Sequence, residues 1–480
     1  MHLPDQWAHR RPKRRAAAVA GALVLSLAAY VAPAGASAAV SSSHQAPVPG
    51  AVLPKPATGP PELVPNTGHT LQTVRQMVQC GGTMFAVGSF SDITQNGTTY
   101  SRTNVFSFDA SSPYTITQWA PQVNGIVNSI AFSGGNCADA YIGGNFTSVN
   151  GTAVKDIAEI DTTVGNVVPT FGHVTSGGQV ETLASAGNHI LAGGYFKWIN
   201  GSGKDPYMAS LSPVTGQDDG FLHLNISGYY NYCSGSQCTQ GKTSSVQNQQ
   251  VSHLGQYDLV EGDFTSAGGQ PRQQIFMLNL TTSPATVTPW TSPQWDGSDP
   301  NQPYRCMPIE AFYIRSAAWS LDDSTVYIAT TGYHPAGGPT GQTPRTGLCD
   351  AAASFPATMG PVTANWIEYT GCDSYYTVAA DDSAVYVAGH PRYAENSDGC
   401  DGPGPGAIKD YGLQGLSPSN GEVYVRPDGT AVYRMSRANA DSMLLTSAGL
   451  WIGSSNRFGS QSCGQMPGHS GVCLLPYPGT

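Results

Sequence analysis

The sequence predicts an all-β protein: a single-domain, seven-bladed β-propeller that follows an N-terminal signal peptide and a Pro-rich arm. Three observations lead to this fold. Only 11% of the 480 residues are charged and 57 are Gly, a composition typical of turn-rich β proteins. Short apolar strands recur at intervals typical of propeller blades, each ending in a small-residue step. No amphipathic helical period extends beyond two turns.

Residues 1–38 are predicted to be the signal peptide. Five basic residues form its n-region: Arg10, Arg11, Lys13, Arg14 and Arg15. An apolar run from Ala16 to Ala32 follows, and Ala36-Ser37-Ala38 fits a small-x-small cleavage site. The alternative is an uncleaved anchor at the short limit for spanning a bilayer. We therefore expect a secreted, extracellular protein without stable membrane insertion.

Residues 39–70 are rich in Pro and Ser and are expected to form a linker or an arm that closes the propeller. Residues 71–480 are expected to form the propeller, in which seven strands end near these glycines: Gly88, Gly144, Gly194, Gly262, Gly332, Gly389 and Gly453. We expect these strands to be the innermost ones, where only small residues let the backbones pack closely. An array of β-sandwiches is the alternative architecture.

All ten cysteines lie after residue 38, and an even number in an exported chain indicates disulfides. Five sequential bridges are the simplest solution, although the sequence does not fix the connectivity. The expected pairs are Cys80–Cys137, Cys233–Cys238, Cys306–Cys349, Cys372–Cys400 and Cys463–Cys473. Because no pair has Cys-x-x-Cys spacing, we predict neither a thiolate metal site nor a redox motif.

Two stretches resemble known families of repeats. Residues 142–151, followed by 157–161, look like the delta-60-type β-propeller repeat of large secreted bacterial proteins, with diverged copies over residues 71–290. In the second half, five segments resemble the associated C-terminal blades, of a Gly-Gly-His-x-Arg type, in secreted actinobacterial propeller proteins: residues 348–350, 369–373, 385–393, 404–407 and 449–454. Cys372 and Tyr393 depart from that pattern, which has Gly and Trp there. The resemblance implies the fold and the compartment but no activity.

The candidate ligand-binding residues are His334, Asp350, Asp373, His390 and Arg392. They follow strands in neighbouring predicted blades, so we expect their loops to converge on one mouth of the central channel. A structural alternative pairs Asp373 with Arg392 as a fixed salt bridge. The acidic pairs Asp322-Asp323 and Asp381-Asp382 precede two copies of one strand and are interpreted as turn residues.

The function predicted from these features is extracellular binding or scaffolding, with a glycan, a cell-wall polymer or a protein as partner. A net charge of −10 disfavours nucleic acid. The sequence lacks the usual hydrolase, metalloprotease and phosphate-binding motifs, and we predict a monomer without cofactor. The main alternative is a polysaccharide hydrolase or lyase with carboxylates at the channel mouth. A quinone- or copper-dependent sugar oxidase is a weaker one.

Overall fold

The described part of the chain is all-β, as the sequence predicts. The computed structural model describes residues 45–64, 71–172, 177–199, 205–229, 243–295, 306, 311–333, 347–435, 440–456 and 470–480. Within them, the only helices are two single-turn 3-10 helices, η1 (Pro169–Phe171) and η2 (Pro293–Trp295). None of the described residues forms a helix long and apolar enough to cross a membrane. The predicted signal peptide lies outside the described residues.

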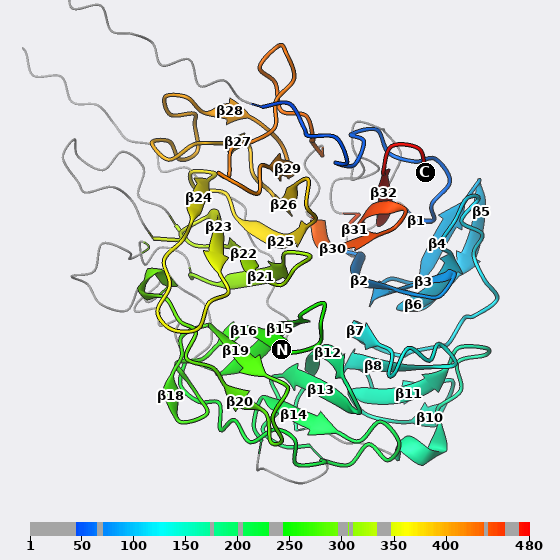
Figure 1. Ribbon diagram of the computed structural model, residues 1–480. Helices are drawn as coiled ribbons and strands as arrows, with labels where there is room; N and C mark the ends of the chain where they lie inside the picture. Colours follow the sequence, from blue (N-terminus) through cyan, green and yellow to red (C-terminus); the bar gives the residue numbers. More distant parts are fainter. Residues whose placement is uncertain are drawn as a thin grey trace, which may run out of the picture. The chain divides into compact units, whose positions relative to one another are not determined.

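Seven antiparallel sheets of three or four strands follow one another along the described residues (Figure 1). The first three contain β2 (Thr73–Cys80), β3 (Thr83–Ser89) and β6 (Val105–Asp109); β7 (Ile126–Ala131), β8 (Asp139–Asn145) and β11 (Ile157–Asp161); and β12 (Val180–Ala186), β13 (His189–Gly194) and β14 (Met208–Leu211). The fourth contains β15 (Ser245–Val251), β16 (Tyr257–Asp263), β19 (Ile275–Asn279) and β20 (Thr286–Val287).

The remaining three continue the same pattern, in which consecutive strands of a sheet are neighbours. They contain β21 (Ile314–Trp319), β22 (Thr325–Thr330), β23 (Ala351–Pro356) and β24 (Trp366–Tyr369); β25 (Tyr375–Ala380), β26 (Val385–Gly389) and β29 (Leu413–Leu416); and β30 (Ala440–Thr446), β31 (Gly449–Ser454) and β32 (Val472–Pro476). Short strands make small additional sheets: β1 (Glu62–Leu63) with β4 (Asp92–Gln95) and β5 (Thr98–Ser101), β9 (Ser148–Val149) with β10 (Thr152–Ala153), β17 (Ser266–Ala267) with β18 (Gln270–Pro271), and β27 (Tyr393–Ala394) with β28 (Ile408–Lys409).

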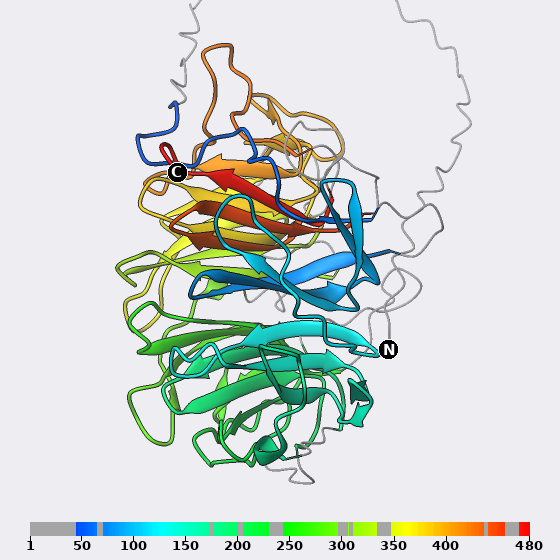
Figure 2. The ribbon, with the colours of Figure 1, turned by 90° about the vertical axis from the view of Figure 1, so that its right-hand side faces the viewer.

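The first strands of the seven sheets contact one another in a ring. β2 contacts β7, β7 contacts β12, and the series continues through β15, β21 and β25 to β30, which contacts β2 again. Figures 1 and 2 both show the last sheet beside the first. The strands that end in glycine are therefore second strands, one position outward from the innermost place that the sequence predicted for them.

The core is divided among the interfaces between neighbouring sheets. Seven hydrophobic clusters are formed by the described residues, and each joins one sheet to the next. One of them joins the last sheet to the first: Trp451 and Leu474 pack with Met84 and Phe106. Burial of apolar surface therefore holds the first sheet to the last in the same way as it holds sheets adjacent in sequence.

A β-bulge explains the recurring glycine better than close packing at a channel. Every first strand shifts register at one position, and the paired residue on the second strand is Gly88, Gly144, Gly194, Gly262, Thr330, Gly389 or Ser454. At the five glycines an added Cβ would lie 2.0–2.3 Å from a carbonyl oxygen in the first strand or in the residue directly before it. The register corrects two predicted steps: Thr330 and Ser454 take the places assigned to Gly332 and Gly453.

Three of the predicted disulfides are confirmed among the described residues: Cys80–Cys137, Cys306–Cys349 and Cys372–Cys400. Cys473 is also disulfide-bonded, but Cys463, its predicted partner, lies outside the described residues, as do Cys233 and Cys238. The three bridges are compatible with an extracellular protein.

The Pro-rich segment before Leu71 runs along the outer strand of the last sheet. Backbone N–H groups of Leu53, Ala57 and Leu63 donate to carbonyl oxygens of Pro476, Leu474 and Ser470, at 2.7, 2.9 and 2.7 Å respectively. The Leu63 side chain is 1% exposed. The segment thus covers an edge of β32 whose backbone groups would otherwise be open to pairing.

Candidate functional site

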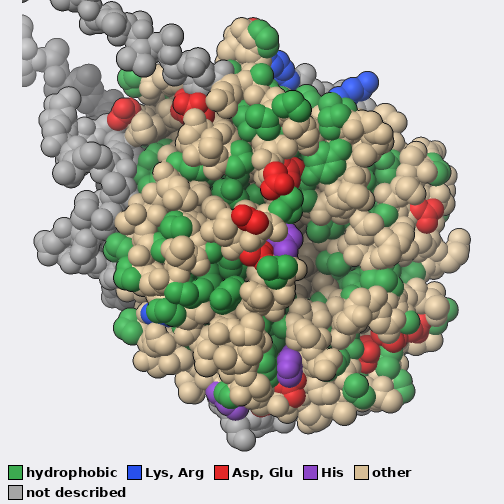
Figure 3. Space-filling view, viewed as in Figure 1, with side chains coloured by type: hydrophobic (Ala, Val, Ile, Leu, Met, Phe, Trp, Pro, Cys, Tyr) green, Lys and Arg blue, Asp and Glu red, His purple; other side chains and the backbone are tan. Residues whose placement is uncertain are grey.

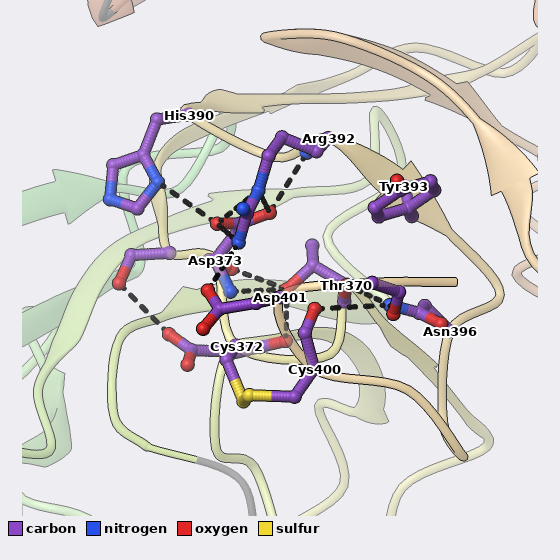
Figure 4. A network of polar contacts seen from close by, with 12 residues as sticks. Thr370, Cys372, Asp373, His390, Arg392, Tyr393, Asn396, Cys400 and Asp401 are labelled. Atoms are coloured by element: carbon purple, nitrogen blue, oxygen red, sulfur yellow. Dashed lines mark hydrogen bonds and ion pairs between the residues drawn. A yellow bond between two sulfur atoms is a disulfide. The ribbon is translucent and has the colours of Figure 1, made fainter. Parts of the chain in front are cut away.

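Asp373 and Arg392 form the centre of a polar network in the sixth sheet (Figure 4). Asp373 lies in the loop between β24 and β25, and Arg392 follows β26. The backbone N–H, Nε and Nη2 of Arg392 all donate to the Asp373 carboxylate, at 2.8–3.1 Å. Burial alone would raise the pKa of Asp373, but hydrogen bonds from His390 and Arg392 and the positive charge of Arg392 lower it. The predicted structural salt bridge is therefore present.

The loop that carries Arg392 is fixed at several further points. Nη2 of Arg392 also donates to Asp401, at 2.8 Å, and the hydrogen bonds to Asp373 and Asp401 raise the pKa of Arg392. The Cys372–Cys400 disulfide joins the loop of Asp373 to the same segment. The side-chain amide of Asn396 donates to the Thr370 carbonyl oxygen at 3.0 Å. Together these bonds give the residues around Arg392 a defined position.

His390 is partly accessible and also contacts its neighbours in the network. Nδ1 of His390 lies 3.7 Å from Oδ1 of Asp373, and 41% of the His390 side chain is exposed. The His390 ring meets the Tyr376 ring edge to face, with centroids 5.3 Å apart. This arrangement leaves part of the imidazole open to a ligand while Asp373 and Tyr376 restrict its orientation.

Of the other two predicted residues, the structure describes only Asp350. Asp350 is fully buried and accepts a hydrogen bond at 2.8 Å from the hydroxyl of Ser374, the neighbour of Asp373. Asp350 therefore does not face solvent, and its hydrogen bond from Ser374 holds the loop that carries Asp373. His334 lies outside the described residues. The structure thus brings Asp373, His390 and Arg392 together, and buried Asp350 is linked to them through Ser374.

The interpretation of the acidic pairs as turn residues is confirmed. Asp322 accepts the backbone N–H of Ser324 at 3.1 Å within its own turn, and Asp381 accepts that of Ser383 at 2.7 Å. Asp323 accepts the backbone N–H of His253 at 2.9 Å, which links the turns of the fourth and fifth sheets. These carboxylates hold backbone groups.

The bulges create a second group of candidate residues that the sequence analysis missed. The extra residue in each first strand is Arg75, Asn128, Glu181, Gln247, Arg315, Tyr376 or Asp441, and this group is called the bulge ring. All seven are half-buried or exposed, whereas the residue before each is at most 1% exposed. A bulge re-aims its side chain, and here the re-aimed side chains are polar in every sheet.

Interactions between the bulge-ring residues cross from sheet to sheet. The Arg315 guanidinium lies over the Tyr376 ring, 5.5 Å from its centroid. Burial raises the pKa of Glu181, while a hydrogen bond from Gln179 and the charges of Arg75 and Arg315 act in the opposite direction. Because Arg75 and Arg315 lie two sheets away from Glu181 on opposite sides, these charges act across the space that the first strands enclose. Figure 3 shows one face of the molecule hollowed near its middle, with acidic and histidine side chains around the hollow.

A signal for the bulge ring is present in the sequence. Each first strand has a buried residue, then the bulge residue, then Gln, Ser, Thr or Asn, as in Val74-Arg75-Gln76, Val127-Asn128-Ser129 and Val180-Glu181-Thr182. Aligning the strands that precede each glycine step would have shown one variable polar position in every repeat. Tyr376 also connects the two groups, because it belongs to the bulge ring and contacts His390.

Searches for related proteins identify distant structural likenesses. No protein-family model matches the chain, and no curated protein matches it. The WD40 β-propeller domain of Doa1 is 12% identical, with a TM-score of 0.42 over 83% of this chain and 93% of that one. The WD40 repeats of RRP9 are 10% identical, with a TM-score of 0.41 over 88% and 98%. The computationally designed protein Ika8 is 8% identical, with a TM-score of 0.41 over 86% and 99%. Likenesses this distant indicate no function for this chain.

Proposed function

We propose that this chain is a secreted, single-domain, seven-bladed β-propeller that binds an extracellular ligand without chemically changing it. The closed series of contacts between first strands and the seven cores between sheets support seven blades. The hydrogen bonds between residues 53–63 and the last sheet support closure by the arm. The disulfides support an oxidising compartment.

The bulge ring is the observation that carries the binding role. An extra residue in a bulge is left out of strand pairing, so pairing does not fix its side-chain chemistry, although the Asn128 amide donates to the Val180 carbonyl oxygen of the next sheet at 2.9 Å. Four of the seven side chains interact around the space that the first strands enclose: Arg315 lies over Tyr376, and the charges of Arg75 and Arg315 act on Glu181. A concave site lined by several convergent polar groups is the usual setting for ligand binding.

In this proposal the network around Arg392 supports the site from one side. His390 contacts the ligand at the channel mouth, and Asp373 and Arg392 are positioning residues that hold its loop. Asp350 reinforces the same loop through Ser374. His334 is proposed to reach the same mouth from the preceding blade.

A specific observation favours a second function, a polysaccharide hydrolase or lyase. Glu181 and Tyr195 both have a raised pKa, chiefly through burial, and the charges of Glu181 and Asp263 also raise that of Tyr195. A carboxyl with a raised pKa can act as a general acid, and a second carboxylate could assist. This second function requires that the protein cleave the polysaccharide that it binds, which a purely binding protein does not do.

Binding to glycan, cell-wall and peptide arrays tests the proposal. The secreted protein is compared with a double variant, His390→Ala and Tyr376→Ala, and with His223→Ala, an exposed histidine in the loop after β14. We expect binding that is lost in the double variant and retained in His223→Ala. Equal binding by all three proteins would overturn the site. Release of new reducing ends or unsaturated products from a bound polysaccharide would overturn the non-catalytic role.

A further inference from the structure

The charges of the bulge ring alternate around the seven sheets. Sheets one, three, five and seven contribute Arg75, Glu181, Arg315 and Asp441, so the sign changes at each charged position. The three sheets between them contribute neutral amide or phenol side chains. The ring therefore carries no net formal charge, and an anionic or cationic polymer meets attraction and repulsion in equal number. A ligand without net charge is favoured.

The end groups of the ring suit a ligand with many hydroxyls. Six of the seven side chains end in a planar guanidinium, carboxylate or amide, and each of these presents two or more polar atoms side by side. A hydroxyl both donates and accepts, so neighbouring hydroxyls on a sugar can pair with any of these groups. The hydroxyls of an oligosaccharide can therefore pair both with the donors and with the acceptors of the bulge ring, whereas an anionic group only accepts hydrogen bonds.

Tyr376 supplies an apolar surface in this polar ring. The Arg315 guanidinium and the His390 ring both contact its aromatic ring, at 5.5 and 5.3 Å between centres. These contacts restrict the phenol before any ligand arrives, so little conformational entropy is lost on binding. The ring of an aromatic residue suits the C–H face of a pyranose, and the phenol oxygen adds a polar end.

Resting on the proposed binding function, we infer that the bulge ring is a binding site for a neutral oligosaccharide. A sugar ring packs on Tyr376, and its hydroxyls pair with Arg315 on the neighbouring fifth sheet and with Glu181 on the third sheet, across the enclosed space. Gln179, whose side-chain amide donates to Glu181, orients that carboxyl as a positioning residue. A peptide is the competing ligand class, and it is an outcome of the test below.

Calorimetric titration of the full secreted protein tests the ligand class. The probes are cellohexaose, chitohexaose and mannohexaose as neutral oligosaccharides, hexagalacturonate as an acidic one, and a zwitterionic pentapeptide. We expect at least one neutral probe to bind, with a dissociation constant that changes less than about twofold between 50 and 500 mM NaCl, because screening acts on charged ligands. Hexagalacturonate and the pentapeptide are expected to bind at least about tenfold more weakly.

Substitutions locate the binding. Tyr376→Ala should weaken binding of the neutral oligosaccharide at least about tenfold. Tyr376→Phe keeps the aromatic ring and should change the affinity less than about threefold. Tyr100→Ala is the matched control, since Tyr100 also carries an arginine, Arg102, at 5.6 Å from its ring. If Tyr376→Ala does not fold, Tyr376→Leu keeps the apolar bulk without the aromatic face and replaces it. Glu181→Gln leaves the ring with a net positive charge and should improve hexagalacturonate binding about threefold or more.

The outcomes separate this inference from the proposed function. Binding of the pentapeptide or hexagalacturonate, sensitive to Tyr376→Ala but without binding of any neutral oligosaccharide, would overturn the saccharide assignment and leave a binding propeller. Binding of a neutral oligosaccharide that is unchanged by Tyr376→Ala or its replacement would place the sugar elsewhere and also overturn the inference. Failure of the wild-type protein to bind any array ligand would overturn the proposed function itself.

Discussion

Asp373 accepts hydrogen bonds from three separate groups of Arg392, two of them on the guanidinium and one on the backbone. The carboxylate is buried, with 7% of its side chain exposed, while 38% of the Arg392 side chain is exposed. Among the described residues, loss of the arginine would leave the buried Asp373 carboxylate with the His390 ring, 3.7 Å away, as its remaining basic partner. The main role of the Asp373–Arg392 pair is therefore to hold the loop that carries His390 in position.

Arg392→Met is expected to lower the free energy of unfolding by about 2–3 kcal/mol, less than for a fully buried pair because the guanidinium is partly solvated. Urea unfolding measures the change. Asp401→Asn, at the 81% exposed end of the same network, is the control and should stay within about 0.5 kcal/mol of the wild type. Equal effects of the two substitutions would mean that Asp373 does not depend on Arg392.

The buried Glu368 should make stability depend on pH. Burial raises its pKa to about 7, despite hydrogen bonds from the Tyr375 hydroxyl and the Glu395 backbone. The folded protein therefore holds a proton that the unfolded chain releases above about pH 4.3, so stability falls as the pH rises from about 4.3 to 7. Glu368→Gln should remove roughly 3 kcal/mol of that fall.

Unfolding at several pH values, compared with the exposed control Asp109→Asn, measures this effect. Part of the decrease in stability with rising pH should remain in Glu368→Gln, because burial also raises the pKa of Glu159 to about 7. A pH profile of Glu368→Gln that is parallel to the wild type would show that Glu368 is ionised in the folded protein at pH 5.

The glycines opposite the bulges should not tolerate a side chain. In Gly144→Ala the new Cβ would lie 2.1 Å from the carbonyl oxygen of Ile126, and the backbone must move to relieve the collision. We expect a loss of about 1–3 kcal/mol. Gly82→Ala is the matched control, since nothing lies within 4 Å of its Cβ position. Denaturation midpoints that agree for the two variants would contradict the role of the bulge.

These glycines also show how far sequence reasoning reaches. Their recurrence predicted an all-β repeat correctly, because each repeat obeys the same local steric rule. Their place within the sheet was predicted wrongly: the conspicuous strand is the second, and the innermost strand has a variable polar residue that repeats less visibly. Thr330 and Ser454 take the glycine position in two sheets, and no local pattern identifies them without strand register.

One part of the candidate site could also be predicted from the sequence, and another part could not. The proximity of Asp373, His390 and Arg392 could be predicted, because their loops follow strands of neighbouring repeats; in the structure Asp373 precedes β25, and His390 and Arg392 follow its partner β26. The relation of Glu181 to Arg75 and Arg315 could not, because it depends on closure of the ring over more than 200 residues of sequence. The three confirmed disulfides needed only an even number of cysteines and sequential pairing.

The arm should contribute to stability through Leu63. Its side chain is 1% exposed and packs in the core between the last and first sheets. Leu63→Ala is expected to lower the free energy of unfolding by about 2–4 kcal/mol. Leu53→Ala, on the same segment but 41% exposed, should have little effect. If the two leucines contribute equally, the arm does not close the last sheet through this contact.

A crystal structure of the protein with a neutral oligosaccharide bound tests the central claim most directly. We predict seven sheets in one closed ring, with a sugar ring packed on Tyr376 and hydroxyls within hydrogen-bonding distance of Glu181 and Arg315. Electron density for the sugar on the outer strands or at a disulfide loop, with the bulge ring occupied only by water, would contradict it.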